Sequence, residues 1–303
     1  MTLLCMKNKQ SKTTPPKKSG KGTVSRKTTS TTSRRTQRKG VPKKKKIAKK
    51  WEVPHWLYYI LMGVIAVAFI ALFYYFFIRP YAYRWKPCYG LKGYGVCMPS
   101  GYYVHGIDIS HHQGTIDWKM LSQTRTSQFP IRFLFMKATE GGDFADNHFT
   151  ANFDSARANG FIRGAYHFYN PKTDAVRQAD FFIRSVDLQA GDLPPVLDIE
   201  QKSRDMDKLR KDLKIWLQKV ERHYGVKPII YTSYRFKTSY LNDSVFNSYP
   251  YWIAHYYVDS VEYKGEWQFW QHHDAGTLPG IDKRVDLNVF NGTLKQLDSL
   301  LIK

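Results

Sequence analysis

The chain has 303 residues and a formal net charge of +22, which would suit a nucleic-acid-binding protein if the charge were spread over the folded part. It is not, because residues 1–50 contain 18 of the 47 Lys and Arg residues and no Asp or Glu. The rest of the chain holds 29 basic and 25 acidic side chains. This balance gives no reason to expect a nucleic-acid partner.

Residues 1–53 form a basic segment that is rich in Ser, Thr, Lys and Arg and nearly free of aromatic residues. Such a composition buries too little apolar surface to offset the entropy of ordering, so we expect a disordered tail. Its charge is sufficient to orient a membrane protein, and it could also contact nucleic acid or anionic lipid. Cys5 in this segment is expected to be a reduced thiol.

Residues 56–78 read WLYYILMGVIAVAFIALFYYFFI, without a charged residue. As a helix this stretch would be about 34 Å long, enough to cross a hydrocarbon core roughly 30 Å thick. Aromatic residues gather at both of its ends, as at two membrane interfaces. We predict a transmembrane helix over 54–79. A cleaved signal peptide is the alternative, but its apolar region is shorter, and no A-x-A pattern follows here.

The positive-inside bias places the N-terminus in the cytoplasm and residues 80–303 in the periplasm or outside the cell, as in a single-pass membrane protein. Residues 80–103 are then a linker that contains Cys88 and Cys97 in a glycine-rich stretch. In an oxidising compartment these two cysteines are expected to form a disulfide. Two cysteines without further ligands nearby do not predict a metal site.

From residue 104 onward, apolar strand-like runs alternate with amphipathic stretches. Strands are expected at 104–110, 133–139, 161–169, 194–200, 228–233, 251–257, 267–273 and 285–290. Helices are expected near 117–126, 147–159, 174–186, 206–223 and 293–302. Alternating strands and helices favour parallel βα units, whereas the last three strands leave no room for full helices between them. We predict an α/β fold, a modified TIM-like barrel of five βα units followed by three strands.

Four acidic residues stand out on three of these strands. Asp108 lies near the end of the first strand, Asp198 and Glu200 close the fourth, and Asp286 lies in the last. Side chains two apart on a strand point the same way, so Asp198 and Glu200 should share a face. Each acid alone could cap a turn or pair with a nearby base, but burying four together for structure would be costly. In α/β barrels the carboxyl ends of the strands carry the active site, so we take these four as candidate catalytic residues.

Aromatic and amide side chains accompany the acids. Rings of Tyr and Trp can stack on sugar C–H faces and hydrogen-bond to hydroxyls. The candidates for glycan binding are Tyr166, Tyr231, Trp252 and Gln271. The residues expected in the core instead are Phe168, Trp267 and Phe269.

The chemistry that two carboxylates in a cleft support is glycoside hydrolysis. Because Asp198 and Glu200 lie close together, the pKa of one should rise, so that it stays protonated and can act as an acid. The chain has no GxSxG elbow, P-loop or dinucleotide fingerprint. His111, His112, His272 and His273 follow no metal-binding pattern. Neither a metal nor a cofactor is therefore expected.

Five motifs resemble those of glycoside hydrolase family 25, the muramidase or Chalaropsis-type lysozymes. They are GIDISHHQGTIDW (106–118), FMKATEGGDFAD (135–146), GAYHFYNP (164–171), PPVLDIE (194–200) and VDLNVFNG (285–292). The resemblance runs from about residue 104 to the C-terminus and implies a catalytic domain over 104–303. It also implies cleavage of the β-1,4 bond between N-acetylmuramic acid and N-acetylglucosamine in the glycan strands of peptidoglycan.

The same resemblance assigns roles to the acids. Glu200 would be the general acid/base, Asp198 would orient and stabilise the reacting centre, and Asp108 and Asp286 would complete the acidic set. It further implies a retaining, substrate-assisted route in which the 2-acetamido group attacks the anomeric carbon and Asp198 holds the acetamido nitrogen. Two carboxylates on one side of a strand agree with this route better than with a simple inverting pair.

Two other functions remain open from the sequence. One is a non-catalytic glycan-binding module on the same fold, against which the four intact acids argue. The other is a hydrolase of chitin-like N-acetylated glycans, because only the family resemblance favours muramic acid. A membrane anchor would keep such an enzyme near its own membrane and suits remodelling of the cell's own wall.

Overall fold

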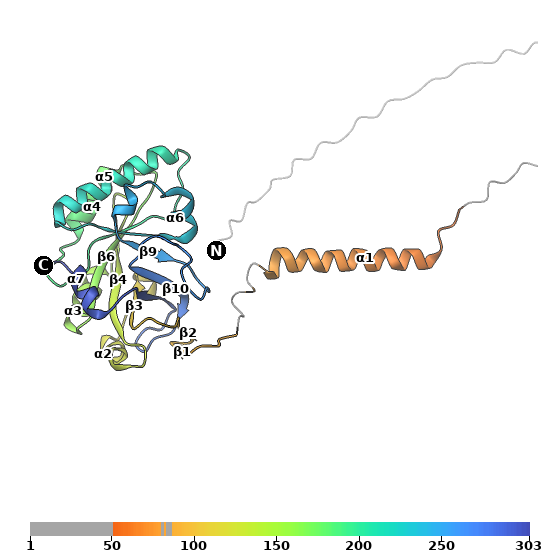
Figure 1. The fold of residues 1–303 in the computed structure, drawn as a ribbon, viewed down its shortest axis with the longest axis horizontal. Coiled ribbons are helices and arrows are strands. Elements are labelled where there is room, and N and C mark those ends of the chain that lie inside the picture. The colour runs from red at the N-terminus through yellow and green to blue at the C-terminus, as the bar shows by residue number, and fades with distance from the viewer. Residues whose placement is uncertain (1–50, 80–81, 83–86) are drawn as a thin grey trace, which may run out of the picture. The chain divides into compact units, whose positions relative to one another are not determined.

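The computed structural model describes residues 51–79, 82 and 87–303. The basic segment 1–50 and its predicted disorder lie outside these residues, as does Cys5. The described residues comprise an apolar helix and an α/β domain (Figure 1), and each is described by itself.

The apolar helix α1 runs over His55–Phe73 and continues as a π-helical stretch over Tyr74–Ile78. The 24 residues His55–Ile78 are long and apolar enough to cross a membrane, and they overlap the segment predicted to do so. The helix has no polar face, which distinguishes it from an amphipathic surface helix.

Eight strands of the α/β domain close into a barrel. They are β3 (Val104–Ile109), β4 (Ile131–Glu140), β6 (Ile162–Phe168), β7 (Val196–Asp198), β8 (Ile229–Ser233), β9 (Tyr251–Ala254), β10 (Phe269–Gly276) and β11 (Val285–Phe290). Strand β3 pairs with both β4 and β11, which completes the ring. The predicted barrel is thus confirmed.

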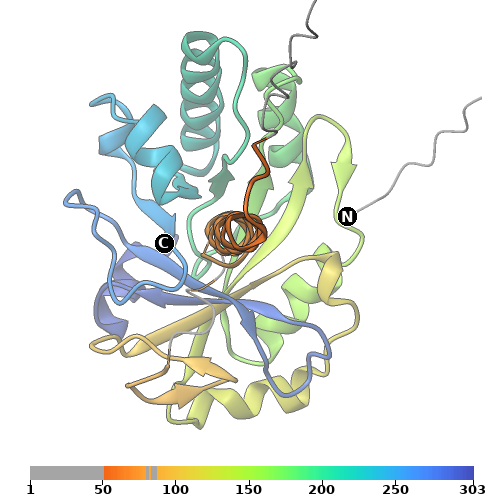
Figure 2. The ribbon, with the colours of Figure 1, turned by 90° about the vertical axis from the view of Figure 1, so that its right-hand side faces the viewer.

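The first five barrel strands are each followed by a helix, and the last three are not followed by one until the C-terminus. The helices are α2 (Trp118–Ser122), α3 (Phe149–Ala158), α4 (Ala175–Ser185), α5 (Met206–Tyr224), α6 (Tyr234–Tyr240) and α7 (Leu294–Leu300), with short 3-10 turns at His111–Gln113, Gln123–Thr126 and Phe246–Ser248. Helices α4 and α5 lie side by side (Figures 1 and 2). Side-chain oxygens of Asp174 and Asp205 accept backbone N–H groups at the starts of α4 and α5, which explains why these helices begin there.

Three details differ from the sequence expectation. Strand β11 runs antiparallel to both of its neighbours, whereas the other barrel pairs are parallel. Strand β7 is only three residues long, so Glu200 lies just beyond it. Helix α6 has seven residues, too short to show a clear helical period in the sequence.

Aromatic rings fill the barrel interior on the side away from the carboxyl ends of the parallel strands. Phe135 stacks on Trp252 with ring centroids 4.4 Å apart, and Phe133 meets Phe269 edge-on at 5.2 Å. Two glycines make room for these rings: a β-carbon on Gly106 would lie 2.4 Å from Phe133, and one on Gly164 would lie 2.7 Å from Phe135. These four rings, from Phe133, Phe135, Trp252 and Phe269, are called the floor below. The open part of the barrel lies between the floor and the carboxyl ends of the parallel strands.

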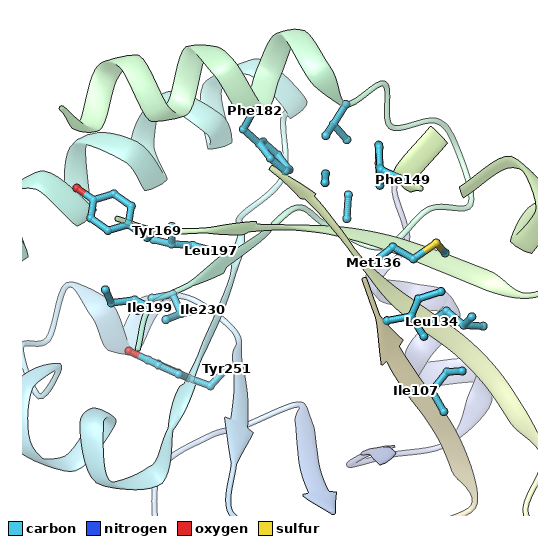
Figure 3. Close-up of a cluster of buried hydrophobic side chains, with 14 of the residues drawn as sticks. Ile107, Leu134, Met136, Phe149, Tyr169, Phe182, Leu197, Ile199, Ile230 and Tyr251 are labelled. Carbon is cyan, nitrogen blue, oxygen red and sulfur yellow. The ribbon is translucent and has the colours of Figure 1, made fainter. Parts of the chain in front are cut away.

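A second apolar layer lies between the outer face of the strands and the helices. It takes the alternate residues of each strand, such as Ile107 of β3 and Leu134 and Met136 of β4 (Figure 3). These side chains are at most 1 % exposed. The period-two alternation of the strands thus separates the outer core from the barrel interior.

Part of the predicted linker belongs to the folded domain. Strands β1 (Lys92–Gly93) and β2 (Val96–Cys97) form a hairpin, closed by a disulfide between Cys88 and Cys97. Val96 and Met98 are buried in the outer core, and the Tyr94 hydroxyl donates to the carbonyl oxygen of Phe129. The hairpin contacts β10 beside the barrel (Figure 2).

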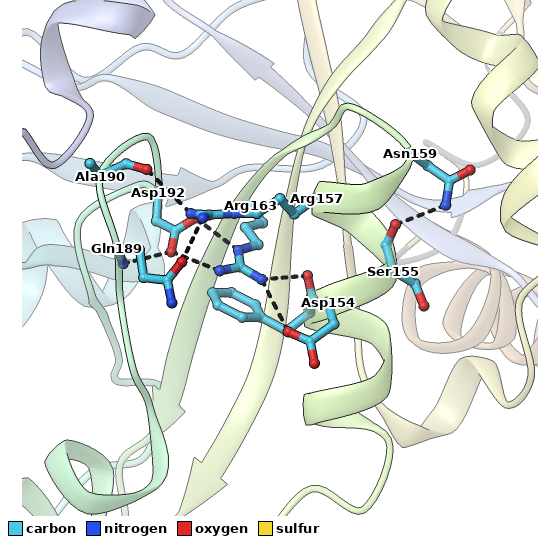
Figure 4. A network of polar contacts seen from close by, with 9 residues as sticks. Asp154, Ser155, Arg157, Asn159, Arg163, Gln189, Ala190 and Asp192 are labelled. Atoms are coloured by element: carbon cyan, nitrogen blue, oxygen red, sulfur yellow. Dashed lines mark hydrogen bonds and ion pairs between the residues drawn. The ribbon is translucent and has the colours of Figure 1, made fainter.

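A buried ion pair holds the end of the barrel opposite the carboxyl ends of the strands. Arg163 of β6 donates to Asp192 through Nε at 2.8 Å and Nη2 at 3.2 Å, and Arg157 of α3 donates to the same carboxylate at 2.7 Å (Figure 4). Arg163 also lies over the ring of Phe153 and donates to its carbonyl oxygen. These contacts join α3, β6 and the loop that leads into β7.

We expect Arg163→Met to lower the free energy of unfolding by about 3 kcal/mol, because the buried Asp192 carboxylate would lose the buried partner that bonds to both of its oxygens. The measurement is denaturant unfolding of the full chain in detergent micelles, followed by tryptophan fluorescence. Asp154→Ala is the control: Asp154 is 76 % exposed and lies 3.4 Å from Arg163, so its loss should cost no more than about 0.5 kcal/mol. Equal effects of the two changes would contradict the prediction.

Candidate active site

A pocket of about 260 Å³ opens at the end of the barrel where the parallel strands have their carboxyl ends. It is lined by Asp108, Ser110, His112, Lys137, Tyr166, Phe168, Asp198, Glu200, Tyr231, Trp252, Tyr256, Gln271 and Asp286. All four acids and all four glycan-binding candidates from the sequence are in this set. A larger pocket of about 330 Å³ at the opposite end of the barrel contains none of them.

The backbone explains how the four acids meet. Asp108, Asp198 and Glu200 lie at the carboxyl ends of β3 and β7. Asp286 lies near the beginning of β11, yet it reaches the same end of the barrel because β11 is antiparallel, and it pairs directly with Asp108. The sequence placed Asp286 in the right set without indicating this reversal.

The aromatic residues singled out in the sequence differ in how deeply they are buried. Trp252 is 2 % exposed and lies among the rings of the floor, whereas Tyr166 is only partly buried. Phe168 was expected in the core, but it is partly exposed and lines the pocket, so that prediction is wrong. Its position two residues after Tyr166 gives it the same inward direction. Phe269 is fully buried as expected, and Trp267 packs partly buried against the outer core.

Hydrogen bonds converge on one oxygen of Asp108. The amides of Gln271 and Asn288 both donate to its Oδ2 at 2.7 Å. Gln271 in turn accepts from the hydroxyl of Tyr231 at 2.7 Å, and Asn288 accepts from the indole of Trp252 at 2.7 Å. Much of the pocket wall is thus one connected network.

Asp198 differs from Asp108 in its hydrogen bonding. It is 6 % exposed, and its Oδ1 is buried without a hydrogen-bond partner in the described part of the chain. A buried carboxylate oxygen normally has a donor. Since Asp198 lines the pocket, a bound molecule with an N–H or O–H group could supply one.

Burial raises the pKa of every acid in the pocket. For Asp198 the neighbouring Glu200 adds to the rise, and for Asp286 the pKa reaches about 7, with Asp274 and Glu200 as further causes. The pKa of Glu200 is also raised by desolvation, although the Tyr231 hydroxyl and Lys137 oppose the rise. Its side chain is the most exposed of the four acids, so it is both protonatable and accessible.

The sequence reasoning missed Lys137 and Tyr256. Lys137 follows Phe133 and Phe135 at intervals of two, so it points inward above the floor; its ammonium group pairs with Glu140 at 2.6 Å. Tyr256 follows Trp252 and Ala254 in the same way and donates to Gln271 at 2.5 Å. Counting every second residue beyond the apolar part of each strand would have found both.

The four histidines singled out in the sequence have different surroundings. No group of three His, Cys, Asp or Glu side chains suited to a metal ion occurs within residues 51–79, 82 and 87–303. His111 bonds to Asp146 at 2.8 Å through Nδ1, and His272 is buried with a pKa well below its ordinary value because of desolvation. Of the four histidines considered, His112 lines the pocket.

We expect Asp286→Asn to stabilise the fold at pH 7 by about 1–3 kcal/mol and to have little effect near pH 4. Between its ordinary pKa of 3.8 and its folded pKa of about 7, the folded chain holds a proton that the unfolded chain has released. The free energy of unfolding should therefore fall as the pH rises through this range, and Asn removes that loss. The measurement is denaturant unfolding of the full chain at pH 4, 5.5 and 7.

The control for this prediction is Asp298→Asn on the surface of α7, which removes an exposed carboxylate. A stabilisation by Asp286→Asn that is equal at all three pH values, or a loss of stability at pH 7, would contradict the prediction.

Comparison with known proteins agrees with this geometry. The family model described as glycosyl hydrolases family 25 matches residues 107–281. The Escherichia coli K12 protein YegX is 40% identical over 227 residues, covering 74% of this chain and 81% of that protein. Lysozyme M1 of Streptomyces globisporus is 33% identical over 214 residues, covering 65% and 71%.

Solved structures give the same answer. A family 25 glycosyl hydrolase from Bacillus anthracis has a TM-score of 0.61 and 32% identity, covering 67% of this chain and 95% of that chain. A bacterial lysozyme from Streptomyces coelicolor has a TM-score of 0.61 and 30% identity, covering 67% and 98%. The chain therefore belongs to glycosyl hydrolases family 25 and is a glycoside hydrolase.

Proposed function

We propose that the chain is a muramidase that cleaves the β-1,4 bond between N-acetylmuramic acid and N-acetylglucosamine in peptidoglycan. The observation that carries the proposal is the pocket that holds Asp198 and Glu200 together with two further acids. The names of relatives support the substrate: besides Lysozyme M1, an N,O-diacetylmuramidase from Chalaropsis sp. is 28% identical over 217 residues, 65% of this chain and 98% of that protein.

In this proposal Glu200 protonates the leaving glycosidic oxygen. Desolvation raises its pKa, which favours the protonated form that a general acid needs. Its exposed position at the pocket gives it access to a polymeric substrate. After the bond breaks, the same carboxylate accepts a proton from the incoming water.

Asp198 assists from the same strand end. Its unpaired Oδ1 is an acceptor for the N–H of a 2-acetamido group, and this bond would hold the acetamido oxygen against the anomeric carbon. The bond to the leaving oxygen then breaks as the C1–O bond to the acetamido group forms, and water later opens the oxazolinium ion with retention. The positions of Asp198 and Glu200 on the same side support this route. An inverting mechanism would need one carboxylate of the pair on the opposite face of the sugar.

We expect Glu200→Gln to lower the rate of peptidoglycan cleavage by about 10³-fold, because it removes the proton donor and leaves the shape unchanged. The full chain in detergent micelles is incubated with purified peptidoglycan, and the products are reduced with borohydride and identified by mass spectrometry. Reduced muramic acid ends are expected. The control is Glu266→Gln, an exposed residue at the opposite end of the barrel, which should cleave like the unchanged chain.

Other outcomes of the same assay select the alternatives. Reduced glucosamine ends would show a hydrolase that cuts the other glycosidic bond of peptidoglycan. Cleavage of chitin oligomers at a similar rate would show that the substrate includes chitin-like glycans. Binding of glycan without cleavage would show a non-catalytic module. Rapid cleavage of de-N-acetylated glycan, or an inverted anomer in the first product seen by NMR, would contradict substrate assistance.

We further propose that α1 anchors the enzyme in a membrane, with the basic segment in the cytoplasm and the barrel outside. The length and composition of His55–Ile78 support the anchor, and the excess of Lys and Arg before it supports the orientation. An anchored muramidase acts on wall material near its own membrane. Anionic lipid is the partner that suits the basic segment.

We expect the protein to stay with membranes after a carbonate wash, since removal of the predominantly apolar 24-residue helix His55–Ile78 from lipid is highly unfavourable. Protease added outside intact spheroplasts should digest the barrel and spare an epitope at the N-terminus. Recovery of the mature protein in the culture medium, cut after residue 80, would contradict the anchor. Digestion of the N-terminal epitope with the barrel protected would show the opposite orientation, with the barrel in the cytoplasm.

A further inference from the structure

The hydrogen bonds around Asp108 have a direction that follows from the chemistry of the donors. The indole Nε1–H of Trp252 can only donate, and it lies 2.7 Å from Oδ1 of Asn288. The amide of Asn288 must therefore turn its Nδ2 group toward Asp108, where it donates to Oδ2 at 2.7 Å. Trp252 thus determines which way Asn288 faces.

The second amide has the same orientation. Oε1 of Gln271 accepts from the hydroxyls of Tyr231 and Tyr256, at 2.7 and 2.5 Å. Its Nε2 group is left to donate to Oδ2 of Asp108 at 2.7 Å. Burial raises the pKa of both phenols, so both keep the proton that they donate. Oδ2 of Asp108 accordingly receives two N–H donors.

Asp286 lies directly opposite Asp108 in the pairing of β11 with β3, and both line the same pocket. The β-carbons of such a cross-strand pair are about 4.5–5.5 Å apart. Two carboxyl groups this close in a desolvated site share a proton instead of both ionising. They differ in one respect: within the described part of the chain, no N–H donor bonds to the carboxyl group of Asp286.

We propose that Asp108 and Asp286 share one proton and that Trp252 and Asn288, acting through Asp108, place that proton on Asp286. The two N–H groups that donate to Oδ2 stabilise the ionised form of Asp108 more than its protonated form. Asp286 is then the neutral partner of the pair, and Asp108 is the anion. Trp252 is in this view a positioning residue, although the sequence suggested that it stacks on a sugar.

The electrostatics of the pocket agree with a shared proton. Burial and the neighbouring Asp286 raise the pKa of Asp108 well above its ordinary value, although the two amide donors oppose that rise. The pKa shifts thus favour one proton on the pair, and the hydrogen bonds are the argument for which group carries it. Burial, Asp274 and Glu200 raise the pKa of Asp286 to about 7, so it holds a proton over most of the range below neutrality. Of the groups outside the pair, Glu200 acts on both acids and Asp274 of β10 acts on Asp286. The other titratable side chains that line the pocket are Asp198, Lys137, His112, Tyr166, Tyr231 and Tyr256.

The test is the ¹³C chemical shift of the side-chain carboxyl carbons in the full chain, labelled at aspartate and held in detergent micelles, as a function of pH. Asp108→Asn and Asp286→Asn assign the two signals. At pH 6 we expect a carboxylic acid signal from Asp286 and a carboxylate signal from Asp108. This measurement needs no substrate, so its result is independent of whether the proposed muramidase activity is found.

Two variants test the positioning role. In Asn288→Leu the apparent pKa of Asp286 should fall by at least one unit as the proton moves toward Asp108. Trp252→Phe keeps the ring against Phe135 but removes the N–H, and it should shift the same signals in the same direction by a smaller amount. Trp270→Phe is the control, because its indole donates to the carbonyl oxygen of His255 instead, and it should shift neither signal.

A carboxylic acid signal from Asp108 with a carboxylate signal from Asp286 at pH 6 would overturn the assignment. Independent titration of the two groups would overturn the shared proton. Signals that stay the same in Trp252→Phe and in a folded Asn288→Leu would overturn the positioning role. Retention of the native fold is checked in each variant by the dispersed aspartate signals outside the pocket.

Discussion

The closed barrel imposes one constraint on the whole domain: every second residue of a strand points into the interior. Near the amino ends of the parallel strands these positions hold Phe133, Phe135, Phe269 and Trp252, which pack against one another as the floor of the pocket. Toward the carboxyl ends of the parallel strands, the inward-facing positions hold polar residues instead: Asp108, Lys137, Tyr166, Asp198 and Gln271. The pocket exists because the residues change from apolar to polar partway along each strand while their direction stays the same.

The floor and the pocket depend on each other physically. Rings beneath the acids exclude water, and the resulting desolvation raises the pKa of Asp108, Asp198, Glu200 and Asp286. A group that must donate a proton near neutral pH benefits from this, whereas the stability of the fold does not. The apolar outer core and the Arg163–Asp192 pair stabilise the barrel at positions remote from the pocket. Stabilising contacts and reactive groups therefore occupy different layers.

Much of this architecture was predictable because it follows local rules. The strands, the transmembrane-length helix and the common direction of Asp198 and Glu200 follow from hydrophobic runs and period-two alternation. Phe168 was misassigned because an aromatic residue at a strand end can equally fill a core or line a pocket, and composition does not distinguish the two. Lys137 was overlooked because a single lysine in an apolar strand carries no pattern, although its parity with Phe133 and Phe135 was available in the sequence.

The sequence by itself determined which residues could do the chemistry: the order of its strands, the inward positions and the four acids are all local or periodic properties. Only the tertiary structure decided how those residues meet. The antiparallel direction of β11 brings Asp286 opposite Asp108, and the amides of Gln271 and Asn288 reach Asp108 across 163 and 180 residues of chain. Neither feature has a local signal, because strand direction and long-range hydrogen bonds depend on how the barrel closes, and closure is a property of all eight strands together.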